Sequence, residues 1–234
     1  MLVEALTAGT AEAFYPLASH LHTQAEPAWC GLGTLVTVLN ALEIDPGRQW
    51  KGPWRFFGEE LLVCCKSLEL AASDGLTLAE VECLASCNGA EARAVIAEPG
   101  RESDLRAALD VSVRAPAGPF VVASYARGVL GQTGSGHFSP LAAVHAERDH
   151  VLVLDVARFK YPPHWVPIAL LYRAMLELDP QSGTRRGWMT VGRGPATVRP
   201  EAVASLRSRL LALGAPICPP PPPADPTPGT PSTR

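Results

Sequence analysis

Residues 24–42 read QAEPAWCGLGTLVTVLNAL, and this stretch decides how the rest of the chain is interpreted. Apolar residues recur in it at spacings of three, four and seven, which predicts a buried helix from Cys30 to Leu42. The unpaired N–H groups and the dipole at a helix N-terminus favour an anion and lower the pKa of a thiol. The sequence therefore places Cys30 where a thiolate would be stabilised.

Gln24 lies six residues before Cys30 and carries an amide that suits an oxyanion formed beside the sulfur. Gly31, directly after the cysteine, is expected to let a substrate backbone come close. A glutamine, a short loop and a cysteine that opens a buried helix together predict a site for cysteine acyl transfer. The competing explanation is that Cys30 packs as a small buried hydrophobe.

The composition favours one globular domain without nucleic-acid or membrane partners. The chain has 234 residues, and its net charge of −3 arises from interspersed acids and bases. Residues 1–20 lack the pattern of a secretory signal, and no apolar run is long enough to span a bilayer, so we expect a cytoplasmic protein. Cys64 and Cys65 are adjacent and Cys83 and Cys87 lie one helical turn apart, an unusual disulfide framework, so we predict free thiols.

The periodicity divides the chain into a helical first half and a sheet-rich second half. Helices are predicted over residues 4–13, 30–42, 76–87, 103–109, 167–178 and 200–213, and strands over residues 92–96, 120–125, 138–144, 151–156 and 188–191. This order predicts an α+β domain with a cleft where the halves meet. The domain should occupy residues 1–214, and the proline-rich residues 215–234 should form a disordered tail.

The predicted helix over residues 76–87 carries two further cysteines. Thr77 and Glu80 have the spacing of a capping box, and Cys83 and Cys87 share a helical face with Glu80. Two thiols and a carboxylate on one face are ligands for a soft metal ion. Because no histidine completes a zinc-type spacing, we favour two buried cysteines at the edge of the core.

A thiolate nucleophile needs a base, and the base needs a group that orients it. His137 follows a glycine-rich turn at the start of a predicted strand, and Asp155 ends the next strand, so a hairpin would bring them together. The order cysteine, histidine, acid is that of papain-like enzymes, in which the third member is usually asparagine. The structural alternatives are a histidine bonded to the backbone and an aspartate that caps a turn.

Five segments resemble the phytochelatin synthases, which are glutathione γ-glutamylcysteinyltransferases. They are QAEPAWCGLGTLVTVLNALEIDPGRQWKGPWRFF, VECLASC, QTGSGHFSP, LDVARFKYPPHWVP and TRRGWM, and the resemblance covers residues 4–192. It implies a papain-like fold in which a helical half packs against an antiparallel β-sheet. It also implies a catalytic triad of Cys30, His137 and Asp155, with Gln24 as the oxyanion donor.

Two residues beside the expected site depart from the family pattern. Trp29 stands where the family usually has tyrosine, and Gly33 where alanine is common. Neither departure replaces a catalytic atom. Plant members also carry a second, cysteine-rich domain, and the resemblance places the proline-rich tail at the corresponding point of this chain.

The resemblance implies that Cys30 cleaves the Cys–Gly bond of glutathione and passes γ-Glu-Cys to a second glutathione. The products would be phytochelatins, (γ-Glu-Cys)n-Gly, which serve cadmium detoxification. No organic cofactor is implied, and Cd²⁺ or Zn²⁺ would enter as the glutathione thiolate complex. The expected partners are therefore glutathione and metal-glutathione thiolates, with a homodimer left open.

Five charged residues are candidates for substrate binding. Asp179 and Arg186 match family positions associated with the first substrate, where a carboxylate and a guanidinium would hold the γ-glutamyl head group. Arg158, Lys160 and Arg127 are candidates for the carboxylates of the acceptor. The alternative for these three cations is a solvated, charged rim.

Two other functions compete with the transferase. A glutathione or glutathione-conjugate hydrolase would form the same acyl-enzyme and give it to water. A thiol metal-binding protein without catalysis would use Cys64, Cys65, Cys83 and Cys87, with Cys83 and Cys87 as the first metal candidates. This last function leaves the predicted triad without a role, so the sequence favours an enzyme.

Overall fold

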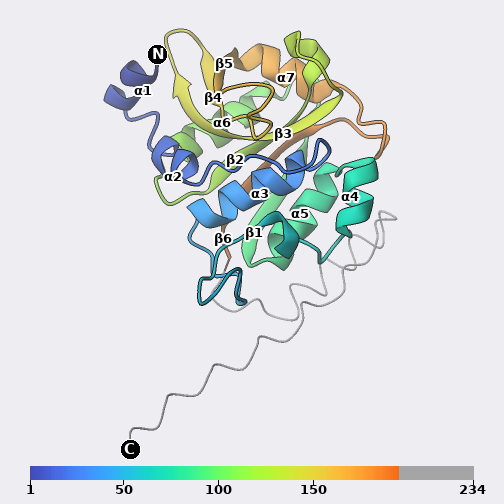
Figure 1. Ribbon diagram of the computed structural model, residues 1–234. Coiled ribbons are helices and arrows are strands. Elements are labelled where there is room, and N and C mark those ends of the chain that lie inside the picture. The colour runs from blue at the N-terminus through green and yellow to red at the C-terminus, as the bar shows by residue number, and fades with distance from the viewer. Residues whose placement is uncertain (195–234) are drawn as a thin grey trace, which may run out of the picture.

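The computed structural model describes residues 1–194, which form a six-stranded sheet with helices on both faces (Figure 1). The helices are α1 (Leu2–Thr7), α2 (Phe14–Ser19), α3 (Cys30–Ala41), α4 (Leu68–Asp74), α5 (Leu78–Cys87), α6 (Glu102–Val113) and α7 (Ile168–Leu176), with short 3₁₀ helices η1 (Glu59–Leu61) and η2 (Arg127–Leu130). The strands are β1 (Ala90–Ile96), β2 (Phe120–Ala126), β3 (Gly136–His145), β4 (His150–Val153), β5 (His164–Pro167) and β6 (Gly187–Arg193). Every pairing is antiparallel, in the order β1-β6-β2-β3-β4-β5.

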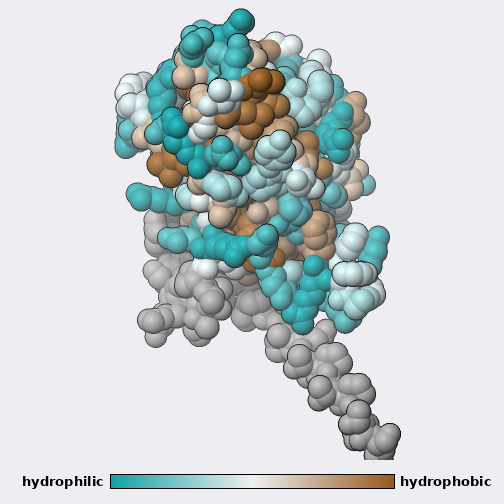
Figure 2. Space-filling model, turned by 90° about the vertical axis from the view of Figure 1, so that its left-hand side faces the viewer, coloured by the Kyte–Doolittle hydropathy of each residue, from teal (hydrophilic) through white to brown (hydrophobic). Residues whose placement is uncertain are grey.

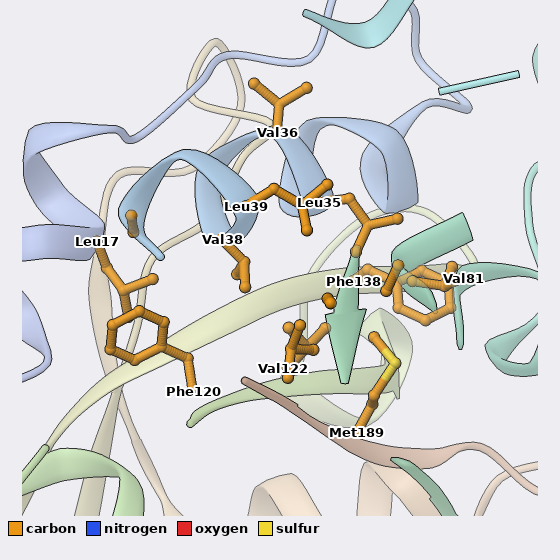
Figure 3. Packing of buried hydrophobic residues seen from close by; sticks show 14 of the residues in the cluster. Leu17, Leu35, Val36, Val38, Leu39, Val81, Phe120, Val122, Phe138 and Met189 are labelled. Atoms are coloured by element: carbon orange, nitrogen blue, oxygen red, sulfur yellow. The ribbon is translucent and has the colours of Figure 1, made fainter. Parts of the chain in front are cut away.

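Helix α3 lies at the centre of one helical layer and is buried on all sides from Gly31 to Ala41. Figure 3 shows Leu35 and Leu39 on the side of the helix that faces the sheet, with Val36 on the opposite side. The buried side chain of Asn40 exchanges two hydrogen bonds of 3.0 Å with the backbone of Phe57. The loop after α3 therefore folds back over the helix and excludes water from its outer side.

The opposite face of the sheet is covered by α6 and α7 (Figure 1). Leu105 and Leu109 of α6 and Leu171 and Met175 of α7 are buried in a second hydrophobic cluster with residues of β2, β3 and β4. Two apolar layers thus enclose the central strands, as expected when helices pack on both faces of a sheet. This packing gives β3, the strand that carries His137, a rigid position.

The structure confirms the predicted α+β class, with differences at the ends of elements. The helix predicted over residues 4–13 is confirmed only at its start and is wrong beyond Thr7, because α1 ends before Gly9, whose positive φ of 65° breaks the helix. Strand β5 and helices α2 and α4 were not predicted, and Pro167 ends β5, so α7 begins one residue after the predicted start at 167. The predicted helix over 200–213 and the tail over 215–234 lie outside the described residues.

The prediction of free thiols is wrong for four cysteines. Disulfides join Cys64 to Cys87 and Cys65 to Cys83, while Cys30 is a free thiol. Neither the adjacent pair Cys64 and Cys65 nor the pair Cys83 and Cys87 on one helix forms a disulfide within itself. The fold instead places the two pairs opposite each other, so that each cysteine on α5 meets one from the loop before α4.

The surface of the described residues is mixed in character. Figure 2 shows a face on which hydrophilic side chains surround smaller hydrophobic groups. Within residues 1–194, no helix combines the length and the apolar character that are needed to cross a bilayer.

Candidate active site

Cys30 is the first residue of α3, as predicted, and its side chain is partly exposed. The role expected for Gly31 is wrong, because this residue faces α5 and not an open cleft. A Cβ atom at Gly31 would lie 2.8 Å from Cδ1 of Leu76 and 3.0 Å from Cγ2 of Val81. Gly31 therefore allows the segment that leads into α5 to pack closely against the helix beside the nucleophile.

His137 and Asp155 are brought together by the antiparallel pair β3–β4. The pairing continues past β4 through a hydrogen bond of 3.1 Å from the backbone N–H of Leu154 to the carbonyl of Pro140. Asp155 follows directly, and its Oδ1 lies 2.9 Å from Nε2 of His137. Both side chains are buried, with exposed fractions of 3% for the histidine and 0% for the aspartate.

Arg127 completes this buried group from the opposite side of Asp155. Its Nη2 donates to Oδ1 of Asp155 at 2.9 Å, and its Nη1 lies 2.9 Å from Oδ2. The backbone N–H of Ala157 donates to the same carboxylate at 2.9 Å, and the guanidinium lies 4.9 Å from the centre of the Tyr161 ring. The guanidinium is 3% exposed and directed at Asp155, so it does not lie on the rim with the other predicted acceptor cations.

These contacts shift three pKa values in directions that favour an ion pair between Cys30 and His137. Burial by itself raises the pKa of Cys30, but the imidazole of His137, the backbone N–H of Phe138 and the charge of Arg127 together lower it. Burial likewise lowers the pKa of His137, while the thiolate of Cys30 and the carboxylate of Asp155 raise it above its ordinary value. Burial raises the pKa of Asp155, and hydrogen bonds from His137 and Arg127 overcome this effect and hold it far below its usual range.

Gln24 is buried beside α3. Its Cβ atom packs against Gly33, where an added Cβ would lie only 3.2 Å away. Its Nε2 donates to the carbonyls of Glu26 at 2.8 Å and Pro27 at 2.9 Å. Its own backbone N–H donates to the carbonyl of Val156 at 3.0 Å, which ties the loop before Cys30 to the segment of Asp155. The predicted oxyanion role thus requires the amide to give up one of two carbonyl partners, and it stays a prediction.

Glu59 is a functional candidate that the sequence did not reveal. Its carboxylate accepts the backbone N–H of Ala25 at 3.1 Å and lies 3.5 Å from Nε2 of His22, although the side chain is buried. It therefore holds the loop that contains Gln24. In the sequence it stands next to Glu60, which is exposed, and no pattern distinguishes the two.

Asp179 and Arg186 meet in a buried ion pair of 3.3 Å. The guanidinium lies against Gly136, because a Cβ atom there would be 2.6 Å from Cζ of Arg186. Gly136 precedes His137 in β3, so the predicted pair for the γ-glutamyl head group lies against the strand that carries the imidazole. Nε of Arg186 is buried without a hydrogen-bond partner, so its N–H can donate to an oxygen of a bound substrate.

Arg158 and Lys160 are exposed beside the same site. The guanidinium of Arg158 donates to the carbonyl of Leu21 at 3.5 Å, and the ammonium of Lys160 donates to the carbonyl of Thr133. These contacts place the two cations over the loops that precede Gln24 and His137. Such a position suits a charged rim and equally suits the carboxylates of an acceptor.

Cys83 and Cys87 lie on α5, and each takes part in one of the two disulfides. Glu80, the carboxylate expected to share a metal ion with them, makes other contacts. Its carboxylate closes the predicted capping box with Thr77 and forms a buried ion pair of 3.2 Å with Lys66. Among the described residues, the sulfurs of Cys64, Cys65 and Cys87 lie within 4.8 Å of one another, and all three belong to the two disulfides. The metal candidates of the sequence are therefore separate from the group formed by Cys30, His137 and Asp155.

The chain is similar to known proteins over most of the described residues. The family model described as Phytochelatin synthase matches residues 1–188. Glutathione gamma-glutamylcysteinyltransferase 3 of Lotus japonicus is 50% identical over 193 residues, which cover 82% of this chain and 40% of that protein. Glutathione gamma-glutamylcysteinyltransferase 1 of Arabidopsis thaliana is 50% identical over 190 residues, which cover 81% of this chain and 39% of that protein. The chain thus spans about two fifths of the length of these curated relatives.

A solved structure also shows some likeness. It is a double glycine motif protease from an AMS/PCAT transporter in complex with the leader peptide, with a TM-score of 0.44 and 17% identity, covering 74% of this chain and 90% of that chain. A similarity with this TM-score and identity gives no information about the function of this chain.

Proposed function

Because the chain belongs to the phytochelatin synthase family, we propose that it is a glutathione γ-glutamylcysteinyltransferase that acts through an acyl-enzyme on Cys30. The observation that supports this most directly is the buried series of alternating charges formed by Arg127, Asp155, His137 and Cys30. Such a series keeps a thiolate and an imidazolium in contact, which a nucleophile and its general acid require.

In the first half of the reaction, the Cys30 thiolate attacks the carbonyl carbon of the Cys–Gly bond in glutathione. The N-terminus of α3 and, after it exchanges one carbonyl partner, the amide of Gln24 would stabilise the negative charge on the oxygen. The C–N bond then breaks while the His137 imidazolium gives its proton to the nitrogen of glycine. The products are free glycine and a γ-Glu-Cys thioester on Cys30.

In the second half, the α-amine of another glutathione attacks the thioester carbonyl. The neutral His137 accepts the proton of this amine, the C–S bond breaks, and the Cys30 thiolate is restored. The new peptide is γ-Glu-Cys-γ-Glu-Cys-Gly, and repetition gives longer phytochelatins. An acceptor that carries Cd²⁺ or Zn²⁺ on its thiolate enters as a metal-glutathione substrate.

The buried pair of Asp179 and Arg186 suits the γ-glutamyl head group of the first glutathione. The carboxylate would accept the ammonium group of the substrate, and the guanidinium would bind its α-carboxylate. The exposed cations Arg158 and Lys160 would serve the acceptor. Glutathione is abundant in the reducing cytoplasm, where we expect this reaction to take place and to contribute to cadmium detoxification.

The test is to incubate purified protein with glutathione, with and without Cd²⁺, and to separate γ-Glu-Cys from its oligomers by chromatography and mass spectrometry. Oligomers and an equivalent amount of glycine support the transferase. Glycine and γ-Glu-Cys without oligomers would show that water is the acceptor, which makes the protein a glutathione hydrolase. Absence of glycine release would overturn both enzymatic functions.

A further inference from the structure

Arg127 has a third polar partner besides the two oxygens of Asp155. Its Nη1, which lies 2.9 Å from Oδ2 of Asp155, also donates to Oε1 of Gln132 at 2.6 Å. Gln132 opens the segment QTGSGHFSP that leads to His137, and its own backbone N–H donates to the carbonyl of Arg127 at 3.1 Å. The loop before β3 thus closes around the guanidinium that supports Asp155.

The amide of Gln132 also contacts His164, the first residue of β5. Its Nε2 lies 2.9 Å from Nε2 of His164, whose Nδ1 lies 2.9 Å from the carbonyl of Pro162. Strand β5 is the edge strand next to β4 (Figure 1), and its register sets His164 opposite Val153, two residues before Asp155. A chain of three hydrogen bonds therefore leads from the buried guanidinium to a half-buried histidine and its carbonyl partner.

The direction of each bond in this chain is fixed by the arginine. A guanidinium only donates, so the atom of Gln132 that faces Arg127 is the oxygen, and the amide nitrogen faces His164. This nitrogen also only donates, so Nε2 of His164 is an unprotonated acceptor. The carbonyl of Pro162 only accepts, so Nδ1 carries the proton. All three contacts thus agree on one state of His164, a neutral imidazole protonated on Nδ1.

We propose that Gln132 and His164 are positioning residues for the proposed catalytic triad and act through Arg127. The oxygen of Gln132 fixes the plane of the guanidinium, so that both of its nitrogens reach the carboxylate of Asp155. His164 fixes the amide, because only the nitrogen of the amide can donate to the unprotonated Nε2, and the oxygen then faces Arg127. This inference rests on the proposed role of Cys30 as the nucleophile.

Neighbouring contacts hold the guanidinium in this place. Its central carbon lies 4.9 Å from the centre of the Tyr161 ring, whose hydroxyl accepts the backbone N–H of Thr133 at 2.8 Å. Gly134, with a φ of 111°, lets the loop pass so close that an added Cβ would be 3.3 Å from Cδ of Arg127. The charge of Arg127 helps to lower the pKa of Cys30, so a displaced guanidinium would leave that thiol with a higher pKa.

The first measurement uses the unmodified full chain and needs no substrate. Nitrogen NMR of protein labelled on histidine reports which ring nitrogen carries the proton. The signals of His164 are assigned by their loss in His164→Phe. At a pH where the imidazole is neutral, they should show the proton on Nδ1, as the chain of hydrogen bonds requires. A proton on Nε2 instead would overturn the proposal.

Gln132→Met keeps the length of the side chain and removes the hydrogen bonds of its amide. It should lower kcat by about 10-fold with little change in the KM for glutathione, because a hydrogen bond to a charged group is lost away from the substrate. It should also move the midpoint of Cys30 alkylation by iodoacetamide to higher pH. Ser135→Ala is the matched control, since the contact of this exposed residue with Arg127 comes from its backbone carbonyl. Both readouts should stay unchanged in the control.

A double-mutant cycle tests whether His164 acts through Gln132. His164→Phe should lower kcat less than Gln132→Met does, because the amide can still reach Arg127 but is no longer oriented. The double variant should be no slower than Gln132→Met alone, since the two residues act as one unit. Losses that add, or an alkylation profile of Gln132→Met that matches Ser135→Ala, would overturn the proposal.

Failure of this proposal can be told apart from failure of the transferase function. The NMR and alkylation measurements require no glutathione, so they test the positioning role whatever the substrate is. If the unmodified protein releases no glycine from glutathione but Gln132→Met still shifts the alkylation of Cys30, the transferase is refuted and the positioning role is supported. Normal glycine release with an unshifted alkylation profile in Gln132→Met gives the opposite result.

Discussion

The replacement Arg127→Met tests the role of the buried cation under Asp155. It removes two contacts of 2.9 Å to a carboxylate that is 0% exposed and leaves that carboxylate without a cation on this side. Removing one partner of a buried ion pair costs about 3–5 kcal/mol. For a domain of this size, such a loss lowers the melting temperature by about 6–20 °C.

The same change should shift the titration of the nucleophile. The charge of Arg127 is one of the causes that lower the pKa of Cys30, and it also keeps Asp155 ionised beside His137. In Arg127→Met the pKa of Cys30 should therefore rise. The assay is the rate of alkylation of Cys30 by iodoacetamide as a function of pH, whose midpoint should move to higher pH.

Two controls separate this role from binding of the acceptor. Lys160→Met removes an exposed cation, so it should leave the alkylation profile unchanged and raise the KM for the acceptor. In Arg127→Met/Asp155→Asn both charges are gone, and stability should partly return because no carboxylate is left unpaired. An unchanged melting temperature and alkylation profile in Arg127→Met, with a raised KM for the acceptor, would refute this reasoning.

Four further predictions concern the site and its support. Cys30→Ser should abolish glycine release, and mass spectrometry of the unmodified enzyme after brief exposure to glutathione should find γ-Glu-Cys on Cys30; an adduct only elsewhere would contradict the assignment. Because the pKa of Asp155 is lowered on folding, its stabilising contribution is present above its unfolded pKa of about 3.9 and is lost as the pH falls further. Asp155 also raises the pKa of His137, so the test is made below the unfolded histidine pKa of about 6.5. The difference in melting temperature between the unmodified protein and Asp155→Asn should be constant from about pH 5.5 to about pH 4 and shrink below it, and a difference that persists at lower pH would argue against this shift. Glu59→Gln should lower kcat by about 10-fold, equivalent to about 1.4 kcal/mol, with little change in KM, while the exposed Glu60→Gln should have no effect; equal effects would exclude a positioning role. Thr77→Ala removes the capping box of α5 and should cost about 0.5–2 kcal/mol in chemical denaturation, and no loss would show that the cap is redundant.

The sequence predicted what depends on local patterns. The helix that begins at Cys30 follows from apolar spacing, and the capping box at Thr77 follows from a four-residue signature. The meeting of His137 and Asp155 could also be predicted, because two consecutive strands with a short connection usually form a hairpin. In each case a local signal decides the structure: apolar spacing, a capping signature, or the short connection between two consecutive strands.

The remaining features depend on contacts between distant segments. The disulfides join residues that are 23 and 18 positions apart, and nothing in their spacing shows that the loop before α4 lies along α5. The packing of Gly31 is also not visible in its own segment, because its partner, Leu76, is far away in the chain. Glu59 likewise acts through a loop 34 positions earlier. Such pairings are set by the packing of the whole core, which periodicity does not encode.

The position of Arg127 explains how an aspartate can serve as the third member of this site. With asparagine in that place, a thiolate and an imidazolium would balance each other, and the buried group would have no net charge. Asp155 adds a negative charge that is 0% exposed, and an unpaired charge at such depth is strongly unfavourable. The guanidinium of Arg127 restores neutrality, and its two nitrogens fix both oxygens of the carboxylate, one of which lies against His137. Aspartate and arginine therefore form one unit here, and the aspartate would be costly without its partner.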